Sequence, residues 1–290
     1  MPDFKQLEKI KKIAIKAIFS DDFLVDRLVL KGGNCIDLAY KLSNRSSIDI
    51  DFSMETDFSQ DELNEFTDML QKKFPQYFNE GGYYPFDIKI TNRPKLNPKD
   101  HKWGGYQLTF KVISHKKYQE FNGGLNQIRK NAIALGKGDS RAFKIDISKF
   151  EYCQNKQSFD LDGVMIYIYS PTMTVFEKLR AICQKMAEYE YNPTRKDEPR
   201  ARDFYDIYIV NEELAKINFK DSENREIITE IFKAKSVPLE FLSKVKEKRE
   251  VHRDDFISVK ATISIASMDY DFYFDYVLAL IDELEGFWVI

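Results

Sequence analysis

The sequence has few of the residues on which disulfide scaffolds, zinc sites and histidine-based active sites depend. Its 290 residues include three cysteines and three histidines. Cys35, Cys153 and Cys183 have no paired spacing, which argues against a disulfide framework and against a zinc site. The histidines lie far apart in the sequence. A histidine metal site or a Ser/His/Asp triad therefore has little support.

Long apolar runs and an excess of positive charge are also missing. No stretch of about 18 apolar residues occurs, and the lysine-rich residues 1–19 read as an amphipathic helix rather than as a signal peptide. We therefore expect no membrane partner and a soluble, cytoplasmic protein. The net charge of −3 excludes a globally basic protein. A local basic groove can nevertheless bind nucleic acid.

What remains is an ordinary folded composition, with 43% hydrophobic and 14% aromatic residues and only 12 glycines and 9 prolines. The first two thirds mix helix and strand patterns, whereas the last third is almost entirely helical. We predict an α+β fold in which residues 1–170 form a mixed sheet flanked by helices. Residues 171–290 are predicted to form a separate helical domain.

The element boundaries follow from periodicity, capping residues and breakers. Ser59 and Glu62 form a capping box at the start of one predicted helix. Helices are predicted at 4–19, 34–42, 59–74, the start of 125–140, 173–190, 201–214, 222–232, 238–250 and 269–287. Strands are predicted at 28–33, 45–54, 85–92, 106–114, 141–148 and 163–170.

The predicted strand RSSIDIDFSM (45–54) carries two acids where a buried strand is expected. Side chains alternate along a strand, so Ile50 and Phe52 share one face while Asp49 and Asp51 share the other. Two carboxylates about 6–7 Å apart on one face repel each other unless a cation lies between them. We therefore expect Mg²⁺ beside Asp49 and Asp51.

A glycine pair precedes this strand. Gly32 and Gly33 let backbone N–H groups approach a phosphate with no Cβ in the way, and Asn34 is expected to cap the helix that follows. Two glycines alone are weak support, because most such pairs are only tight turns. The order of strand, glycine turn, helix and Asp-x-Asp strand is a more specific arrangement.

The segment LKGGNCIDLAYKLSNRSSIDIDF (30–52) resembles the opening motif of the nucleotidyltransferase superfamily, and more closely the AbiEii/AbiGii-type toxin family. That family carries K-G-G-[small]-A-L followed by R-x-S-x-D-[IL]-D-F. Ser47 matches the family's serine, while Asn34 stands where Ser or Thr is usual. The resemblance implies a nucleotidyltransferase-like sheet with a catalytic role for residues 1–170. It assigns nucleotide binding to Gly32, Gly33, Asn34 and Ser47.

The superfamily uses a third carboxylate from a later strand, and Asp146 is the candidate here. Ile145 and Ile147 face one way, so Asp146 faces the other. Three such acids can hold two metal ions about 4 Å apart. We predict that Asp49, Asp51 and Asp146 bind Mg²⁺, with Mn²⁺ as an alternative. The competing interpretation is an aspartate on the exposed face of an edge strand, which needs no ligand.

Residues 177–208 contain Glu-Lys-Leu-Arg-Ala and Arg-Asp-Phe-Tyr-Asp-Ile-Tyr, which resemble the family's downstream K-L-x-A and R-D-x-x-D-[IL]-Y motifs. The resemblance implies that Lys178 contacts the nucleotide phosphates and has a catalytic role. Asp203 is assigned to the nucleotide site, but Asp203 and Asp206 could instead be structural. The simplest such role is an intrahelical ion pair of Asp206 with Arg202.

The resemblance implies transfer of a nucleoside monophosphate from an NTP to an acceptor hydroxyl, with tRNA as acceptor in some relatives. It also implies a toxin of a toxin–antitoxin or phage-defence (abortive infection) pair, with a cognate antitoxin. The helical domain would close the active-site cleft. The basic, glycine-bearing loop 129–138 could dock a polyanionic acceptor. The alternative is a non-catalytic module that binds a nucleotide or a partner protein on the same fold.

Overall fold

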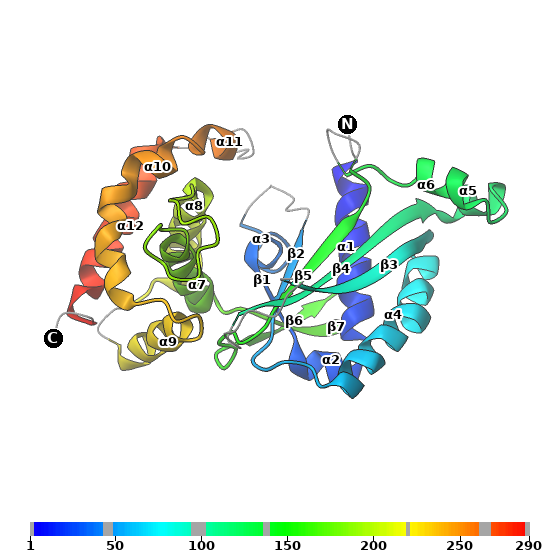
Figure 1. The fold of residues 1–290 in the computed structure, drawn as a ribbon, viewed down its shortest axis with the longest axis horizontal. Coiled ribbons are helices and arrows are strands. Elements are labelled where there is room, and N and C mark those ends of the chain that lie inside the picture. The colour runs from blue at the N-terminus through cyan, green and yellow to red at the C-terminus, as the bar shows by residue number, and fades with distance from the viewer. Residues whose placement is uncertain are drawn as a thin grey trace. The chain divides into compact units, whose positions relative to one another are not determined.

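The computed structural model describes residues 3–42, 49–93, 103–135, 140–218, 221–260 and 268–287 (Figure 1). The chain divides into two compact units, which are described separately. The first unit contains Met1–Ala39, Ser46–Cys153 and Gln157–Ile168. The second unit contains Tyr40–Arg45, Gln154–Lys156 and Tyr169–Ile290. No helix within the described ranges is long and apolar enough to cross a membrane.

The first unit is built on a mixed sheet which, in the described residues, has seven strands in the order β3-β4-β5-β2-β1-β7-β6. The pairs β2/β5 and β1/β7 are parallel and the other neighbours are antiparallel. The strands are β1 (Val29–Lys31), β2 (Ile50–Ser53), β3 (Tyr83–Arg93), β4 (Gly105–Ser114), β5 (Phe143–Ser148), β6 (Gln157–Leu161) and β7 (Val164–Ile168). The predicted α+β class is confirmed.

Helices flank this sheet, and the capping box of Ser59 and Glu62 begins the longest of them as predicted. That helix continues through Pro75 to Glu80, beyond the predicted end. The helical elements are α1 (Phe4–Phe19), α2 (Asp22–Arg27), α3 (Gly32–Asn34), the π-helical turn η1 (Cys35–Ala39), α4 (Gln60–Glu80), α5 (His115–Glu120) and α6 (Leu125–Lys130).

One face of the sheet is apolar and lies under α1 and α4 (Figure 1). The ring of Phe19 on α1 lies 5.6 Å from the ring of Phe52, measured between centroids. Phe74 on α4 lies 5.0 Å from Phe110 in the same way. In register across β1, β2, β5 and β4 this face carries Leu30, Phe52, Ile147 and Tyr106. The alternate residues of the same strands must therefore face the opposite side.

The second unit is helical. On α7, Met173, Phe176, Leu179 and Cys183 form a buried stripe, since each of these residues is 0% exposed. The elements are α7 (Pro171–Gln184), α8 (Ala201–Val210), the π-helical η2 (Asn211–Ala215), α9 (Ser222–Lys233), the 3₁₀-helical η3 (Leu239–Lys248), α10 (Arg249–Arg253), α11 (Phe256–Lys260), α12 (Tyr270–Leu284) and the 3₁₀-helical η4 (Glu285–Phe287).

Several predicted boundaries were wrong. The helix predicted over 173–190 ends at Gln184, where the loop to α8 begins. The helix predicted over 34–42 is a short α-turn followed by a π-turn that ends at Ala39. The predicted strand 45–54 is observed as Ile50–Ser53, and its residues 45–48 lie outside the described residues. The elements α2, α5 and β6 were not predicted.

Candidate functional site

A row of polar residues crosses the sheet on the face opposite α1 and α4. In register from β1 to β3 the row contains Lys31, Asp51, Asp146, Gln107 and Thr91. Residues paired across adjacent strands lie about 5 Å apart and point to the same side. The carboxylates of Asp51 and Asp146 are therefore neighbours, and both side chains are half-buried. Asp49 lies just before β2 and is exposed.

Asp146 lies on an interior strand, because β5 is placed between β4 and β2. The alternative of an aspartate on an edge strand is therefore wrong. Gln107 of β4 donates from Nε2 to Asp146 Oδ1 at 2.8 Å, and its own Oε1 accepts from Arg93. A neutral amide orients the carboxylate without cancelling its charge. Sequence reasoning missed Gln107, although the alternation of β4 placed it on the polar face.

The glycine turn lies directly beside Asp51. Lys31, the last residue of β1, is in register with Asp51, and Gly32 follows with φ +68°. A Cβ at Gly32 would lie 2.9 Å from Asp51 Oδ2, so only glycine allows this close approach without a shift. Lys31 is buried, and its Nζ lies 3.2 Å from Oε1 of the buried Glu151. No pattern in the sequence indicated Glu151.

Asn34 does not cap the helix, so that prediction was wrong. Helix α3 begins at Gly32 with Lys31 as its N-cap, which places Asn34 inside the turn. The Asn34 side chain is 0% exposed, accepts from Lys11 Nζ at 2.9 Å through Oδ1, and donates from Nδ2 to the Asp49 carbonyl. Asn34 thus ties the glycine turn to the backbone of Asp49. Its contact with nucleotide stays a prediction.

The donor chemistry of this face fits Mg²⁺. Mg²⁺ takes oxygen ligands and is commonly held by one or two carboxylates, with substrate phosphates and waters as the other ligands. The neighbouring carboxylates of Asp51 and Asp146 supply such a pair. Among the residues that the structure describes, no group of three or more His, Cys, Asp or Glu side chains is arranged to hold a metal ion. Ser47 lies outside those residues.

In the second unit Lys178 forms a buried ion cluster. Its Nζ on α7 lies 3.0 Å from Asp203 Oδ1 and 2.7 Å from Asp206 Oδ2, both on α8. Burial opposes the charge of Lys178, but the two carboxylates outweigh burial and raise the lysine pKa above its usual range. Burial also opposes the charge of Asp203, yet Arg200 and Lys178 lower its pKa to about 2. Asp206 therefore makes a tertiary contact.

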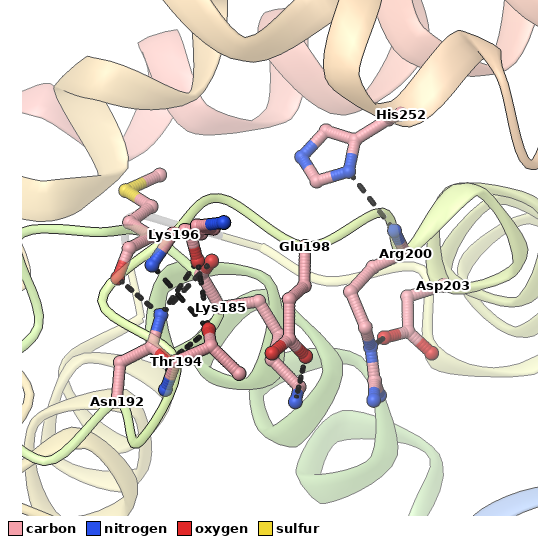
Figure 2. Close-up of polar contacts among 9 residues, drawn as sticks. Lys185, Asn192, Thr194, Lys196, Glu198, Arg200, Asp203 and His252 are labelled. Carbon is pink, nitrogen blue, oxygen red and sulfur yellow. Dashed lines mark hydrogen bonds and ion pairs between the residues drawn. The ribbon is translucent and has the colours of Figure 1, made fainter.

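The connection from α7 to α8 is held by its own side chains (Figure 2). Asn192 donates from Nδ2 to the carbonyls of Met186 and Lys196, each at 2.9 Å, and its Oδ1 accepts from the Thr194 backbone N–H at 3.1 Å. Lys185 pairs with Glu198. These bonds fix the irregular segment between α7 and α8.

Two solved structures are similar to the chain over most of its length. A protein from H. pylori described as a nucleotidyltransferase is 16% identical, with 97% of this chain and 96% of that chain covered and a TM-score of 0.49. An antigenic nucleotidyltransferase-like protein from Paracoccidioides brasiliensis is 15% identical, with 89% and 95% covered and a TM-score of 0.39. Likenesses this distant carry no argument about the site.

The family comparison is decisive for classification. No curated protein matches the chain. The family described as "Nucleotidyl transferase AbiEii toxin, Type IV TA system" matches residues 13–276 of the 290-residue chain. This match includes the glycine turn, the acids of β2 and β5, and the Lys178 cluster. The chain therefore belongs to the AbiEii toxin family of type IV toxin–antitoxin systems and is a nucleotidyltransferase.

Proposed function

We propose that the protein is a Mg²⁺-dependent toxin that transfers a nucleoside monophosphate from an NTP to a hydroxyl of an RNA acceptor, with tRNA as the first candidate. A cognate antitoxin would be its cellular partner. The observation that carries the proposal is the carboxylate pair of Asp51 and Asp146 beside the Gly32 turn. The phosphates of a nucleoside triphosphate require backbone N–H groups such as those of a glycine turn, and the metal ion requires carboxylate ligands beside them.

In this proposal the backbone N–H groups of Gly32 and Gly33 bind the phosphates, with Ser47 and Asn34 nearby in the nucleotide site. The metal ligands would be Asp51 and Asp146, with Asp49 as the third candidate, which the described structure does not gather into one cluster with them. Bound Mg²⁺, or Mn²⁺ in its place, would neutralise charge on the phosphates and activate the attacking hydroxyl. The hydrogen bond from Gln107 would hold the Asp146 carboxylate in one orientation.

The transfer balances without any further reactant. The acceptor oxygen forms a bond to the α-phosphorus, the bond from that phosphorus to the bridging oxygen breaks, and pyrophosphate leaves with the electron pair. Asp146 would take the proton of the acceptor hydroxyl. Lys178, held in place by Asp203 and Asp206, would offset negative charge on the phosphates.

Exposed cations beside the acid row support a polyanionic acceptor. The neighbouring row of the same face contains Lys89, Thr109 and Lys144 in register. Lys89 and Lys144 are exposed on either side of Thr109. Cations spaced along a surface attract a nucleic-acid backbone. In the predicted acceptor loop 129–138, Arg129 is paired with Asp87 at 2.7 Å, and residues 136–139 lie outside the described residues.

The test is label transfer to RNA. The protein is incubated with each α-³²P-labelled NTP, Mg²⁺ and total cellular RNA, and we expect labelled RNA with at least one nucleotide. The double variant Asp49→Ala/Asp51→Ala should lose this labelling and keep the wild-type circular dichroism spectrum. Asp68→Ala, which removes an exposed aspartate from α4, is the matched control.

Two results would contradict the proposal. Equal labelling by the double variant would exclude these acids from the reaction. Bound nucleotide without labelled RNA or any other labelled product would contradict transfer to RNA. Omission of Mg²⁺ together with added chelator should abolish labelling, and Mn²⁺ should restore it.

A further inference from the structure

A buried histidine in the second unit touches the residue that begins α8. His252 on α10 is 2% exposed and lies 5.0 Å from the ring of Phe204, measured between centroids. Its Nδ1 accepts a hydrogen bond from the backbone N–H of Arg200 at 3.0 Å (Figure 2). An accepting Nδ1 means a neutral ring with its proton on Nε2. Burial lowers the His252 pKa to about 4, which favours this state.

Arg200 links His252 to the Lys178 cluster. The Arg200 carbonyl accepts from the backbone N–H of Asp203 at 2.9 Å, and its side-chain Nε donates to Asp203 Oδ2. The other carboxylate oxygen, Oδ1, accepts from Lys178 at 3.0 Å. A continuous path of hydrogen bonds therefore runs from His252 through Arg200 and Asp203 to Lys178.

The segment that precedes Arg200 in the chain is also held by hydrogen bonds and an ion pair. Asp197 accepts from the Ala187 backbone N–H at 2.9 Å and pairs with Lys248 of η3 at 3.0 Å. The segment before Arg200 is thus anchored both to the end of α7 and to η3.

The surroundings of the second ring nitrogen, Nε2, indicate the role of the His252 side chain. Nε2 is buried and has no hydrogen-bond partner among the described residues. A buried donor without a partner is unfavourable. An apolar side chain of similar volume could pack against Phe204 without that cost. The polar ring is therefore explained by its Nδ1 contact with Arg200 rather than by packing alone.

We propose that His252 is a positioning residue for nucleotidyl transfer, which fixes Arg200 at the N-cap of α8 and thereby holds Asp203 and Lys178 in one arrangement. This inference rests on the proposed phosphate role of Lys178. A purely structural histidine would require only the volume of the ring. A positioning histidine requires an acceptor at Nδ1.

The experiment compares substitutions that separate volume from the acceptor, in the full chain. His252→Asn keeps an oxygen near the position of Nδ1, whereas His252→Leu keeps the volume and removes the acceptor. We expect His252→Leu to lower kcat/KM for NTP about tenfold or more, and His252→Asn to stay within about threefold of the wild type. Amide hydrogen exchange at Arg200 should accelerate only in His252→Leu. His115→Asn, in the first unit, should leave activity unchanged.

A third variant keeps the test decisive if His252→Leu does not fold. His252→Gln places its amide oxygen at the position of Nε2 instead of Nδ1, so it should behave like His252→Leu and not like His252→Asn. A wild-type kcat/KM in His252→Leu or His252→Gln, or equal losses in all three variants, would overturn the inference.

The proposed function fails in a different way. If Asp49→Ala/Asp51→Ala retains label transfer in the same assay, the proposed active site is wrong and this inference fails with it. If that double variant is inactive while His252→Leu keeps wild-type kcat/KM and Arg200 exchange, only the positioning role of His252 is overturned.

Discussion

The aspartate pairs of the two units differ in their solvent exposure and in the groups that surround them. In the first unit Asp51 and Asp146 lie side by side and half-buried, and Asp146 receives a hydrogen bond from the neutral amide of Gln107. In the second unit Asp203 and Asp206 have side chains only 4% and 6% exposed, and both contact Lys178. One pair keeps access to solvent, whereas the other is closed around a cation of the chain itself.

This difference separates two uses of a carboxylate. Removing a charge from water is so unfavourable that a buried acid needs a cation and hydrogen bonds around it. The second unit satisfies this need internally, so its acids can hold a side chain in place. The acids of the first unit remain in reach of water, which a metal ion or a phosphate complex can replace. We therefore propose that the compensated aspartates position other groups and that the solvent-accessible aspartates bind the metal.

The largest effect on stability is expected from breaking the buried cluster of Lys178, Asp203 and Asp206. Lys178→Met leaves the buried Asp206 without its cation and Asp203 with Arg200 alone, and we expect the free energy of unfolding of the second unit to fall by about 3–5 kcal/mol. Hydrogen exchange of α7 and α8 peptides under increasing urea measures this loss. Lys72→Met removes an exposed lysine from its pair with Asp68 on α4 and should change stability by about 0.5 kcal/mol or less. Equal effects would show that the buried cluster is not stabilising.

The closed cluster also predicts a pH dependence. The Asp203 pKa is about 2 in the folded chain and about 3.9 in an unfolded chain, so folding favours its charged form. The resulting stability, about 2 kcal/mol, is fully present above about pH 4 and is lost as the pH falls towards about pH 2. Asp203→Asn should flatten the stability profile of the second unit between about pH 4 and pH 2. An unchanged slope would exclude Asp203 as its source.

Local features of the sequence were sufficient for much of the first unit. The capping box at Ser59, the helix at 4–19 and the strands later observed as β3, β4 and β5 all depend on residues close together in the chain. The placement of Asp51 on the polar side of β2 follows from strand alternation alone. These features were predicted because their cause is local.

Other features depend on residues that are distant in sequence. Asp146 is brought beside Asp51 because β5 pairs in parallel with β2, and a strand order of this kind cannot be read from alternation. Asn34 was wrongly assigned as a helix cap because its actual partner, Lys11, belongs to the distant helix α1 and cannot be recognised from the sequence around Asn34. The contact of His252 with Arg200 joins residues 52 positions apart. Tertiary partners of this kind leave no periodic signal in the chain.

The smallest effect is predicted for a substitution that gives the Asp51 and Asp146 pair a cation from the chain, as the Asp203 and Asp206 pair already has. Gln107→Lys places a cation where an amide now donates to Asp146 at 2.8 Å, so Asp146 would gain a counter-charge as Asp203 has in Lys178. The new ammonium would compete with a divalent ion for the same carboxylate. We expect Mn²⁺ affinity, measured by electron paramagnetic resonance, to weaken about tenfold, with a similar fall in label transfer.

The size of this effect depends on where the charge is placed and not on the added charge itself. Gln76→Lys makes the same change on α4, where Gln76 is exposed and bonds Glu80, and it should leave Mn²⁺ affinity unaltered. Gln107→Leu removes the orienting bond without adding a cation and should weaken Mn²⁺ binding less than Gln107→Lys. If Gln107→Lys binds Mn²⁺ as the wild type does, Asp146 is not a metal ligand. The solvent access of the aspartates in the first unit would then have to be explained by phosphate binding alone, without a metal ion at Asp146.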